Sequence, residues 1–548
     1  MTRHYTQQQI FKIMTGLLMA LLTSMISTSV VSTALPTIVG ELGGQDQLAW
    51  VASAALLTMT ASTPLWGKLS DLFGRKLMFQ TALGIFVAGS MAAGLSQNIG
   101  FLIAARAVQG LGVGGLSSLT QVILGDIVEP RERGRYSGFV GAVFGISTVA
   151  GPLLGGFIVD TSWLGWRWCF YVCVPLAIIA AVMIQRVLKL PRVPRDSRLD
   201  WFGAFTITGA AATVMLLLSL GGQEFAWNSA WTYGLAGLCL VLLGLAVLAE
   251  RTAAEPILPP RLFRDRTFVL TALASLFVGV AMFGVLIFLP QYLQIVKGMR
   301  PTASGLMTLP MVLGLFVAST LAGRVATRTG RWKIFPVLGL LCVAVGLALL
   351  ARLHVGSGKL VIGVDIAVVG IGLGLTMQIL ILAAQNAAAH RDLASTTSGV
   401  SFFRNLGGAV GVAAFGAILA DRVSGGMADR LRAAHLRVEG ASELGSPEAV
   451  QRLPGPIRAI VVASFTDAMQ TVFLVGVPVA LAGFLVVLAL KELPLRSSPG
   501  SVEVFPAEPG AAESSLTSGS PGSPTAADSP DVSRASESPQ AGSAALPS

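Results

Sequence analysis

The chain has 548 residues, of which 53% are apolar and only 12% are charged, and its formal net charge is +10. A soluble protein of this length needs far more surface charge, so the composition excludes a soluble globular protein. Apolar runs of roughly 20 residues recur from residue 13 to residue 490. Because such runs cross a bilayer as helices, which satisfy their own backbone groups, we predict an all-α polytopic membrane protein.

Fourteen spans are predicted in chain order, at about 13–38, 49–66, 77–97, 101–126, 136–159, 168–190, 201–221, 230–249, 267–290, 302–323, 334–352, 359–382, 395–419 and 462–490. They form an N-terminal six-helix bundle (13–190), two inserted linker helices (201–249) and a C-terminal six-helix bundle (267–490). Residues 1–12 form a short N-terminus. The tail 491–548 is rich in Ser, Pro, Ala and Gly, so we expect it to be disordered.

Basic residues concentrate in alternate loops, which indicates the orientation of the chain. The loops on the basic side contain Lys68, Arg75, Lys76, Arg131, Arg133, Arg135, Arg192, Arg195, Arg198, Arg261, Arg264, Arg266, Arg324, Arg328, Arg331 and Lys333. Positive loops stay in the cytoplasm, so both termini are expected there and the protein is expected in the plasma (inner) membrane.

The first basic loop contains the sequence GKLSDLFGRK, residues 67–76. Gly67 and Gly74 suit a tight turn between closely packed helices. Asp71, at a helix end beside arginines, can form a partly buried ion pair and so hold one conformation of this gating loop. Ordinary positive charge on a cytoplasmic loop is the simpler interpretation, but it does not explain Asp71.

Arg106 lies within span four, with Gln109 one helical turn further in. An arginine inside a membrane is expected to face a polar cavity or a carboxylate, or alternatively to extend its side chain to the outer interface. Span five concentrates small residues and one helix-bending proline. These residues are Gly145, Gly151, Pro152, Gly155 and Gly156.

The first basic loop is repeated as GRVATRTGRWK at 323–333. The matched positions are Gly67 with Gly323, Gly74 with Gly330, Arg75 with Arg331, and Asp71 with Thr327. Both loops follow the second span of a six-span block, which indicates a duplicated unit. Parallel repeats of this kind are typical of transporters that place their substrate site between the halves.

Few carboxylates could carry a proton through the spans. Asp365 in span twelve is our first candidate, although a late start of that helix would leave it solvated, and the others are Asp467, Asp126 and Glu224. Gln378 in span twelve and Arg404 in span thirteen are candidates for the substrate path, or are residues that hold helices together or lie at the interface.

The long external segment 420–461 carries Val423, Met427 and Leu431 four residues apart. This spacing predicts an amphipathic helix on the outer membrane surface, or alternatively a surface for an outer, periplasmic partner.

Other chemistries lack their signatures in the sequence. It contains no Walker motif, no Ser-His-Asp arrangement and no cluster with metal-ligand spacing, and the letters G-x-G-x-x-G at 110–115 lie in a span without a preceding strand. We therefore predict no enzyme activity, no cofactor, no metal and no nucleic-acid partner.

Several of these segments resemble the major facilitator superfamily. GKLSDLFGRK resembles its signature loop, residues 102–114 its fourth-helix motif and residues 141–156 its antiporter motif in helix five. Residues 32–38, 166–175 and 401–413 resemble its fourteen-helix drug:proton antiporter branch. The resemblance covers about residues 10–495 and implies two six-helix bundles with two inserted helices.

The resemblance also implies roles for single residues. It gives Arg106 a part in proton transfer or binding, and gives helix five a bend and a packed face that prevent leak. Members of this branch usually carry an Asp in span one where this chain has Ser27. A serine cannot cycle a proton near neutral pH, so either another carboxylate serves or the coupling has been lost.

We therefore expect a secondary active exporter, a proton-coupled multidrug antiporter that moves lipophilic small molecules by alternating access. One alternative is an exporter of a lipid, siderophore or endogenous metabolite with the same fold. The other is a membrane sensor or scaffold that does not transport. The expected partners are protons, the substrate, membrane lipid and an outer-surface protein.

Overall fold

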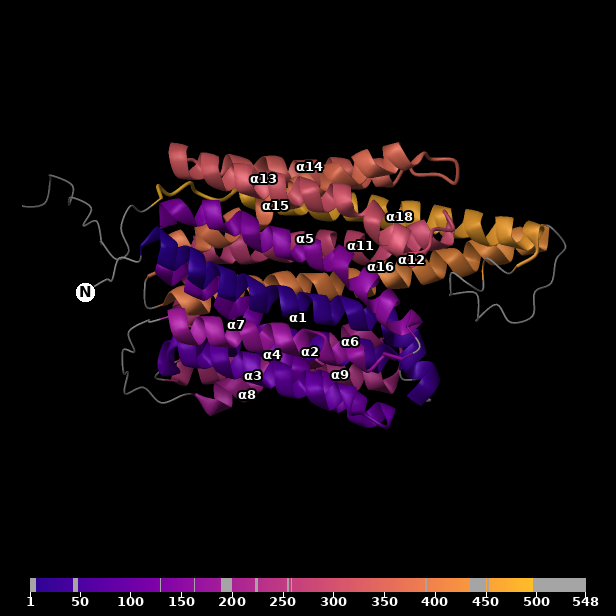
Figure 1. Ribbon diagram of the computed structural model, residues 1–548. Coiled ribbons are helices and arrows are strands. Elements are labelled where there is room, and N and C mark those ends of the chain that lie inside the picture. The colour runs from indigo at the N-terminus through magenta and orange to yellow at the C-terminus, as the bar shows by residue number, and fades with distance from the viewer. Residues whose placement is uncertain are drawn as a thin grey trace, which may run out of the picture. The chain divides into compact units, whose positions relative to one another are not determined.

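Long apolar helices form almost all of the described part of the computed structural model (Figure 1). The structure describes residues 6–42, 48–128, 130–161, 163–188, 200–221, 225–253, 256–257, 259–389, 392–433, 450 and 453–495. The predicted disorder after residue 495 and the candidate Glu224 lie outside these residues.

The helices fall into three groups along the chain. The first group is α1 (Gln7–Leu42), α2 (Leu48–Phe73), α3 (Arg75–Gly94), α4 (Ile99–Ile127), α5 (Pro130–Asp160), α6 (Trp168–Tyr171) and α7 (Cys173–Val187). Next come α8 (Trp201–Leu220), α9 (Ala230–Thr252) and α10 (Pro260–Arg264). The last group is α11 (Arg266–Ile295), α12 (Pro301–Met307), α13 (Leu309–Thr329), α14 (Ile334–Leu350), α15 (Lys359–Ala387), α16 (Leu393–Ala433) and α18 (Gly455–Leu488).

Each predicted span lies on one of these helices, or on two consecutive helices at 168–190 and 302–323. Within the described residues, 12 helical segments are long and apolar enough to cross a membrane. α14 is apolar but shorter, and α2 contains Lys68 and Asp71 and is not among the 12. The all-helical membrane fold is confirmed, and the total of fourteen spans stays a prediction.

Short polar side chains fix several helix starts. Asn98 accepts a hydrogen bond from the backbone N–H of Phe101 at the start of α4, and Asp265 accepts one from Thr267 at the start of α11. Such caps satisfy backbone donors that the helix itself leaves free. They place these helix ends where the sequence turns from apolar to polar.

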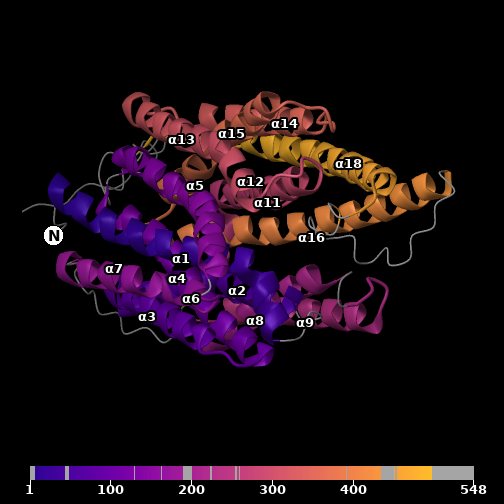
Figure 2. The ribbon, with the colours of Figure 1, turned by 45° about the vertical axis from the view of Figure 1, so that its right-hand side comes forward.

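Two separate apolar cores hold the helices. One cluster of buried residues extends from Ile10 to Leu188 and the other from Ala274 to Leu495. The two sets of helices meet where α5 packs along α13 and where α2 packs against α16 (Figure 2). α8 packs against α9, α2 and α16, so the inserted helices adjoin this second contact.

The external segment differs from its predicted form. α16 continues without a break to Ala433, so residues 420–433 extend a membrane helix and do not begin a separate one (Figure 2). Met427 is buried, and Val423 and Leu431 pack against the C-terminal core. The apolar stripe is therefore covered by protein, chiefly α18, and not by the membrane surface. Residues 434–449 lie outside the described residues.

Candidate functional site

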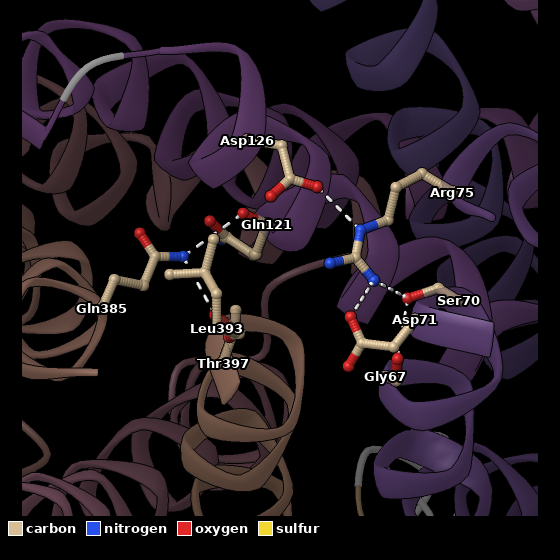
Figure 3. A network of polar contacts seen from close by, with 9 residues as sticks. All are labelled: Gly67, Ser70, Asp71, Arg75, Gln121, Asp126, Gln385, Leu393 and Thr397. Atoms are coloured by element: carbon tan, nitrogen blue, oxygen red, sulfur yellow. Dashed lines mark hydrogen bonds and ion pairs between the residues drawn. The ribbon is translucent and has the colours of Figure 1, made fainter. Parts of the chain in front are cut away.

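The loop between α2 and α3 is organised by one buried arginine (Figure 3). Arg75 Nη1 lies 2.7 Å from Asp71 Oδ1, and Arg75 Nε donates to Asp126 Oδ2 of α4 at 2.7 Å. Arg75 Nη1 also donates to Ser70 Oγ at 2.6 Å. The three charged side chains are only 8–13% exposed. We call Asp71, Arg75 and Asp126 the Arg75 network; it fastens α2, α3 and α4 to one another.

Gly74 makes the turn between α2 and α3 possible. It is the single residue between Phe73 and Arg75, and its φ of 94° lies where side chains with a Cβ atom are strained. Because the turn is this tight, Arg75 at the start of α3 reaches back four residues to Asp71. The predicted pairing of Asp71 with an arginine is present, whereas Asp126 was named only as a proton candidate.

Gly67 lies where the two sets of helices meet. A Cβ atom at this position would collide with the Oγ atom of Ser398 and would come within 3.0 Å of the Ala394 backbone oxygen, both on α16. The missing side chain therefore allows α2 to approach α16 closely. The glycine spacing in the loop predicts that a helix packs closely here, but it does not predict that this helix is α16.

A second contact between the halves lies beside the first (Figure 3). Gln385 Nε2 of α15 donates to the backbone oxygen of Gln121 on α4 at 3.3 Å, and to Thr397 Oγ1 of α16 at 3.1 Å. Gln121 Nε2 donates to Gln378 Oε1 at 3.5 Å. α4 is therefore linked to the Arg75 network on one side and to the C-terminal helices on the other.

The repeated loop between α13 and α14 is built differently. Gly330 ends α13 with a φ of 73°, whereas Arg331 is exposed and its backbone N–H donates to Thr329 Oγ1. Thr327 Oγ1 donates to the Gly323 oxygen of its own helix at 2.7 Å, so it reaches no other helix.

Glu492, which follows α18, holds the repeated loop through its backbone. Its Oε1 accepts from the N–H groups of Trp332 at 2.8 Å and Lys333 at 3.1 Å. Trp332 Nε1 donates to the oxygen of Leu493 at 2.8 Å. Sequence reasoning missed Glu492, because nothing near this residue in the chain marks it as the partner of a distant loop.

Arg106 and its neighbours form a buried polar chain in the N-terminal bundle. Arg106 is 3% exposed, and its Nη1 donates to Gln109 Oε1 at 2.6 Å. Gln109 Nε2 donates to Ser27 Oγ of α1 at 3.0 Å and to Ser90 Oγ of α3 at 2.8 Å. Three predicted residues are thus brought together, and Ser90 is an additional member. The burial of Arg106 contradicts the alternative in which it reaches the outer interface.

Asp365 is buried within α15. The helix begins at Lys359, so this residue lies more than one turn inside it and is 6% exposed. This contradicts the alternative of a late helix start. Within the described residues its carboxylate makes no hydrogen bond or ion pair. Of the other candidates, Asp126 belongs to the Arg75 network and Asp467 pairs with Arg430.

A small apolar cavity of about 30 Å³ lies between α5 and the C-terminal helices α11, α13 and α15. Met282, Leu315, Met377 and Gln378 are among the residues that line it. The Nε2 atom of Gln378 is buried and has no hydrogen-bond partner in the described residues. Ser319 also lines the cavity, and its Oγ is likewise buried without a partner in the described residues, so the cavity offers apolar contact area with a few polar groups, as small-molecule sites commonly do.

Arg404 lies elsewhere, on α16. It is 7% exposed, and its Nε has no partner within the described part of the chain. Its backbone oxygen lies against Gly279 of α11, where a Cβ atom would collide with it. The alternative of an exposed interfacial cation is therefore contradicted. Arg404 does not line the cavity.

The small residues of α5 face two different helices. A Cβ atom added at Gly145 would collide with Val312 of α13, and one added at Gly151 would collide with Ser29 of α1. At Gly155 it would come within 2.9 Å of the Val30 backbone oxygen of α1, whereas at Gly156 it would meet nothing within 4 Å. Pro152 lies inside the helix. α5 is thus packed between α1 of its own bundle and α13 of the other.

Comparisons with known proteins agree with this arrangement. The profile of the Major Facilitator Superfamily matches residues 17–412. An uncharacterised MFS-type transporter of Mycobacterium tuberculosis is 40% identical over 484 residues, which is 88% of this chain and 70% of that protein. The multidrug transporter protein MdtP of Bacillus subtilis is 33% identical over 91% of this chain and 96% of its own length.

Among solved structures, the human organic anion transporter MFSD10 superposes with a TM-score of 0.58 over 87% of this chain and 99% of its own. Its sequence is 14% identical, so this likeness shows the fold alone.

Proposed function

Since the chain belongs to the Major Facilitator Superfamily, we propose that it is a proton-coupled exporter that moves lipophilic small molecules by alternating access. The single observation that carries this proposal is the contact of Gly67 with α16 beside the Arg75 network, because this contact between the halves can separate without breaking an ion pair of the network. Relatives named multidrug transporter and efflux pump support the direction and the substrate class.

The Arg75 network holds α2, α3 and α4 together, so these helices can move as one body when the gate opens. Its three charges all belong to α2, α3 and α4, so no ion pair of the network crosses between the halves. Opening this end would require Gly67 to leave Ser398, and Gln385 to leave Gln121. Breaking neutral hydrogen bonds, such as those between Gln121 and the C-terminal helices, together with a packing contact is far less costly than separating buried charges. The gate can then open while the N-terminal helices move as one body.

The cavity supports a lipophilic substrate. Its lining is apolar apart from a few polar groups such as Gln378, and it lies between α5 and the opposite half. A volume of about 30 Å³ holds no drug-sized molecule, because sites for such ligands measure roughly 300–1,000 Å³. We expect the cavity to widen as α5 and α13 separate. The glycine contact of Gly145 with Val312 lies on that seam.

Asp365 is our candidate for the proton carrier. Ser27 is a hydrogen-bond acceptor for Gln109 and cannot exchange a proton near neutral pH. Asp365 is buried and has no cation or donor partner among the described residues, so a proton can bind it without breaking an ion pair. Arg106, held by Gln109, supplies a fixed positive charge in the other half.

A second candidate function is the export of an endogenous metabolite that is not cationic. Arg106 and Arg404 are buried cations, and neither forms an ion pair with a described carboxylate. Without an acid at Ser27, the spans offer little to attract a cationic drug. This candidate keeps the same fold, gate and cavity.

We further propose that this multi-pass protein resides in the plasma membrane with both termini in the cytoplasm, because the basic loops share that side. It catalyses no reaction in this proposal. The helical extension of α16, which packs on α18, is where we would seek an outer-surface partner.

The test is efflux of lipophilic fluorescent dyes from proteoliposomes under an imposed pH gradient. Wild type should respond to the gradient, whereas Asp365→Asn should transport at the rate seen without one, and Arg106→Ala should be inactive. Asp467→Asn is the matched control, since Asp467 pairs with Arg430 on the outer extension. Wild-type efflux that ignores the gradient would disprove proton coupling, and a panel without any exported dye would favour the metabolite.

A further inference from the structure

A second, larger cavity lies at the end of the helices where the basic loops are. It has a volume of about 540 Å³ and is formed by the start of α1, the start of α5 and the end of α13. We call it the basic groove. Its lining residues are Gln7, Gln8, Phe11, Lys12, Tyr136, Phe139, Phe316, Thr320 and Arg324.

We place the basic groove at the depth of the lipid headgroups, because Lys12 directly precedes the predicted span 13–38 and Arg324 directly follows the predicted span 302–323. The apolar span of α1 begins at Gln7, that of α5 at Phe139, and that of α13 ends at Thr329. Lys12 and Arg324 are each five residues from these ends, a distance at which long basic side chains reach the interface. We therefore expect lipid headgroups to reach the groove.

The groove has a charged part and an apolar part, as a phospholipid has a charged headgroup and apolar chains. Lys12 and Arg324 are exposed and make no ion pair within the described residues. Phe11 is 66% exposed and Phe139 is 44% exposed, so aromatic faces line the apolar side. Thr320 Oγ1 is buried in the wall without a hydrogen-bond partner among the described residues. Two cations suit a phosphate, and the rings suit acyl chains.

We propose that the basic groove binds an anionic phospholipid from the leaflet next to the basic loops, with its phosphate between Lys12 and Arg324. Positive charge at a membrane surface attracts anionic lipid in general, but here the two cations come from opposite halves and share one cavity. A lipid that contacts α1, α5 and α13 together would favour the conformation in which these helices are close.

Binding can be measured by native mass spectrometry of the full chain in detergent, titrated with phosphatidylglycerol or with phosphatidylcholine. Wild type should retain phosphatidylglycerol preferentially. Arg324→Gln or Lys12→Gln should each weaken this binding about 5-fold, the effect of one interfacial cation. The double variant should lose the preference, whereas Arg324→Lys should retain it because the charge remains.

The matched controls remove equal charge outside the groove. Arg328→Gln lies one turn further along α13, and Arg328→Gln with Lys491→Gln matches the double variant; both residues are exposed. These controls should keep the preference. Equal losses in control and groove variants would overturn the site in favour of general surface attraction. Displacement of the lipid by millimolar glycerol phosphate would overturn it in favour of a free-anion site. Neither result depends on whether the protein exports dyes.

Discussion

The loop between α2 and α3 is held by a buried cation between two carboxylates, whereas the loop between α13 and α14 is held through its backbone by Glu492. Both loops keep a glycine with positive φ at the same place, Gly74 and Gly330. Conservation of the turn together with divergence of its partners shows that the turn geometry and the charge network are separable. The first loop fastens α2, α3 and α4 to one another, and the second is held by the segment that follows α18.

The largest difference is expected between Arg75→Gln and Arg331→Gln. Losing Arg75 removes the cation that bridges the largely buried carboxylates of Asp71 and Asp126, which should lower the free energy of unfolding by about 3–5 kcal/mol. Arg331 is exposed, so its loss should change stability by less than ~0.5 kcal/mol. Thermal unfolding in detergent measures the stability of the two variants, and dye efflux measures their transport. Similar losses of stability in the two variants would show that the two loops do not differ in this way.

The next effect is expected at Asp71. Asp71→Asn removes one charge-assisted contact to Arg75 but leaves Asp126 in place, so we expect a loss of about 1.5–3 kcal/mol and impaired transport. Thr327→Val removes only a bond within its own helix and should be nearly silent. Efflux rates at equal expression compare the pair. A Thr327 variant as impaired as the Asp71 variant would contradict this account.

The two glycines should differ when asparagine replaces them. Gly330 has αL angles, with φ 73° and ψ −6°, which asparagine tolerates. Gly74 has φ 94° and ψ 142°, far from that region, so Gly74→Asn should cost about 1–2 kcal/mol. Gly330→Asn should stay within a few tenths of a kcal/mol. Comparing the unfolding temperatures of the two variants decides the matter, and equal shifts would refute the distinction.

The smallest effect is expected at Glu492. Glu492→Ala leaves two backbone N–H groups without their acceptor, and water can partly replace it, so we expect a loss of about 1 kcal/mol. Lys491→Ala, one residue earlier and exposed, is the control. Hydrogen exchange at Trp332 and Lys333 should accelerate only in the Glu492 variant. Unchanged exchange there would show that Glu492 does not hold the loop.

The sequence predicted what depends on local pattern. Apolar runs located the helices because the bilayer sets both their length and their composition. The sequence places Gln109 one helical turn from Arg106, and the structure shows a hydrogen bond between them, since positions three apart share a helix face. Positive φ at Gly74 and Gly330 likewise follows from glycines at a forced turn.

Contacts between distant segments could not be predicted in this way. Ser90 accepts a hydrogen bond from Gln109 only because of the register of α3 on α4, and Ser398 meets Gly67 only because α16 packs on α2. The extension of α16 was missed because Asp421 and Arg422 end the apolar signal without ending the helix. The predicted small-residue cluster of α5 also divides in the structure, since Gly156 faces open space.

One bond is common to both loops and suggests an order of events in the history of the chain. Lys76 Nζ donates to the oxygen of Gln185 at the end of α7, and Lys333 Nζ donates to the oxygen of Leu488 at the end of α18. Each lysine thus ties its loop to the sixth span of its own block. A bond shared by both copies is most simply inherited from a single ancestral six-helix unit. If both halves descend from such a unit, the differing partners of Arg75 and Arg331 arose after its duplication.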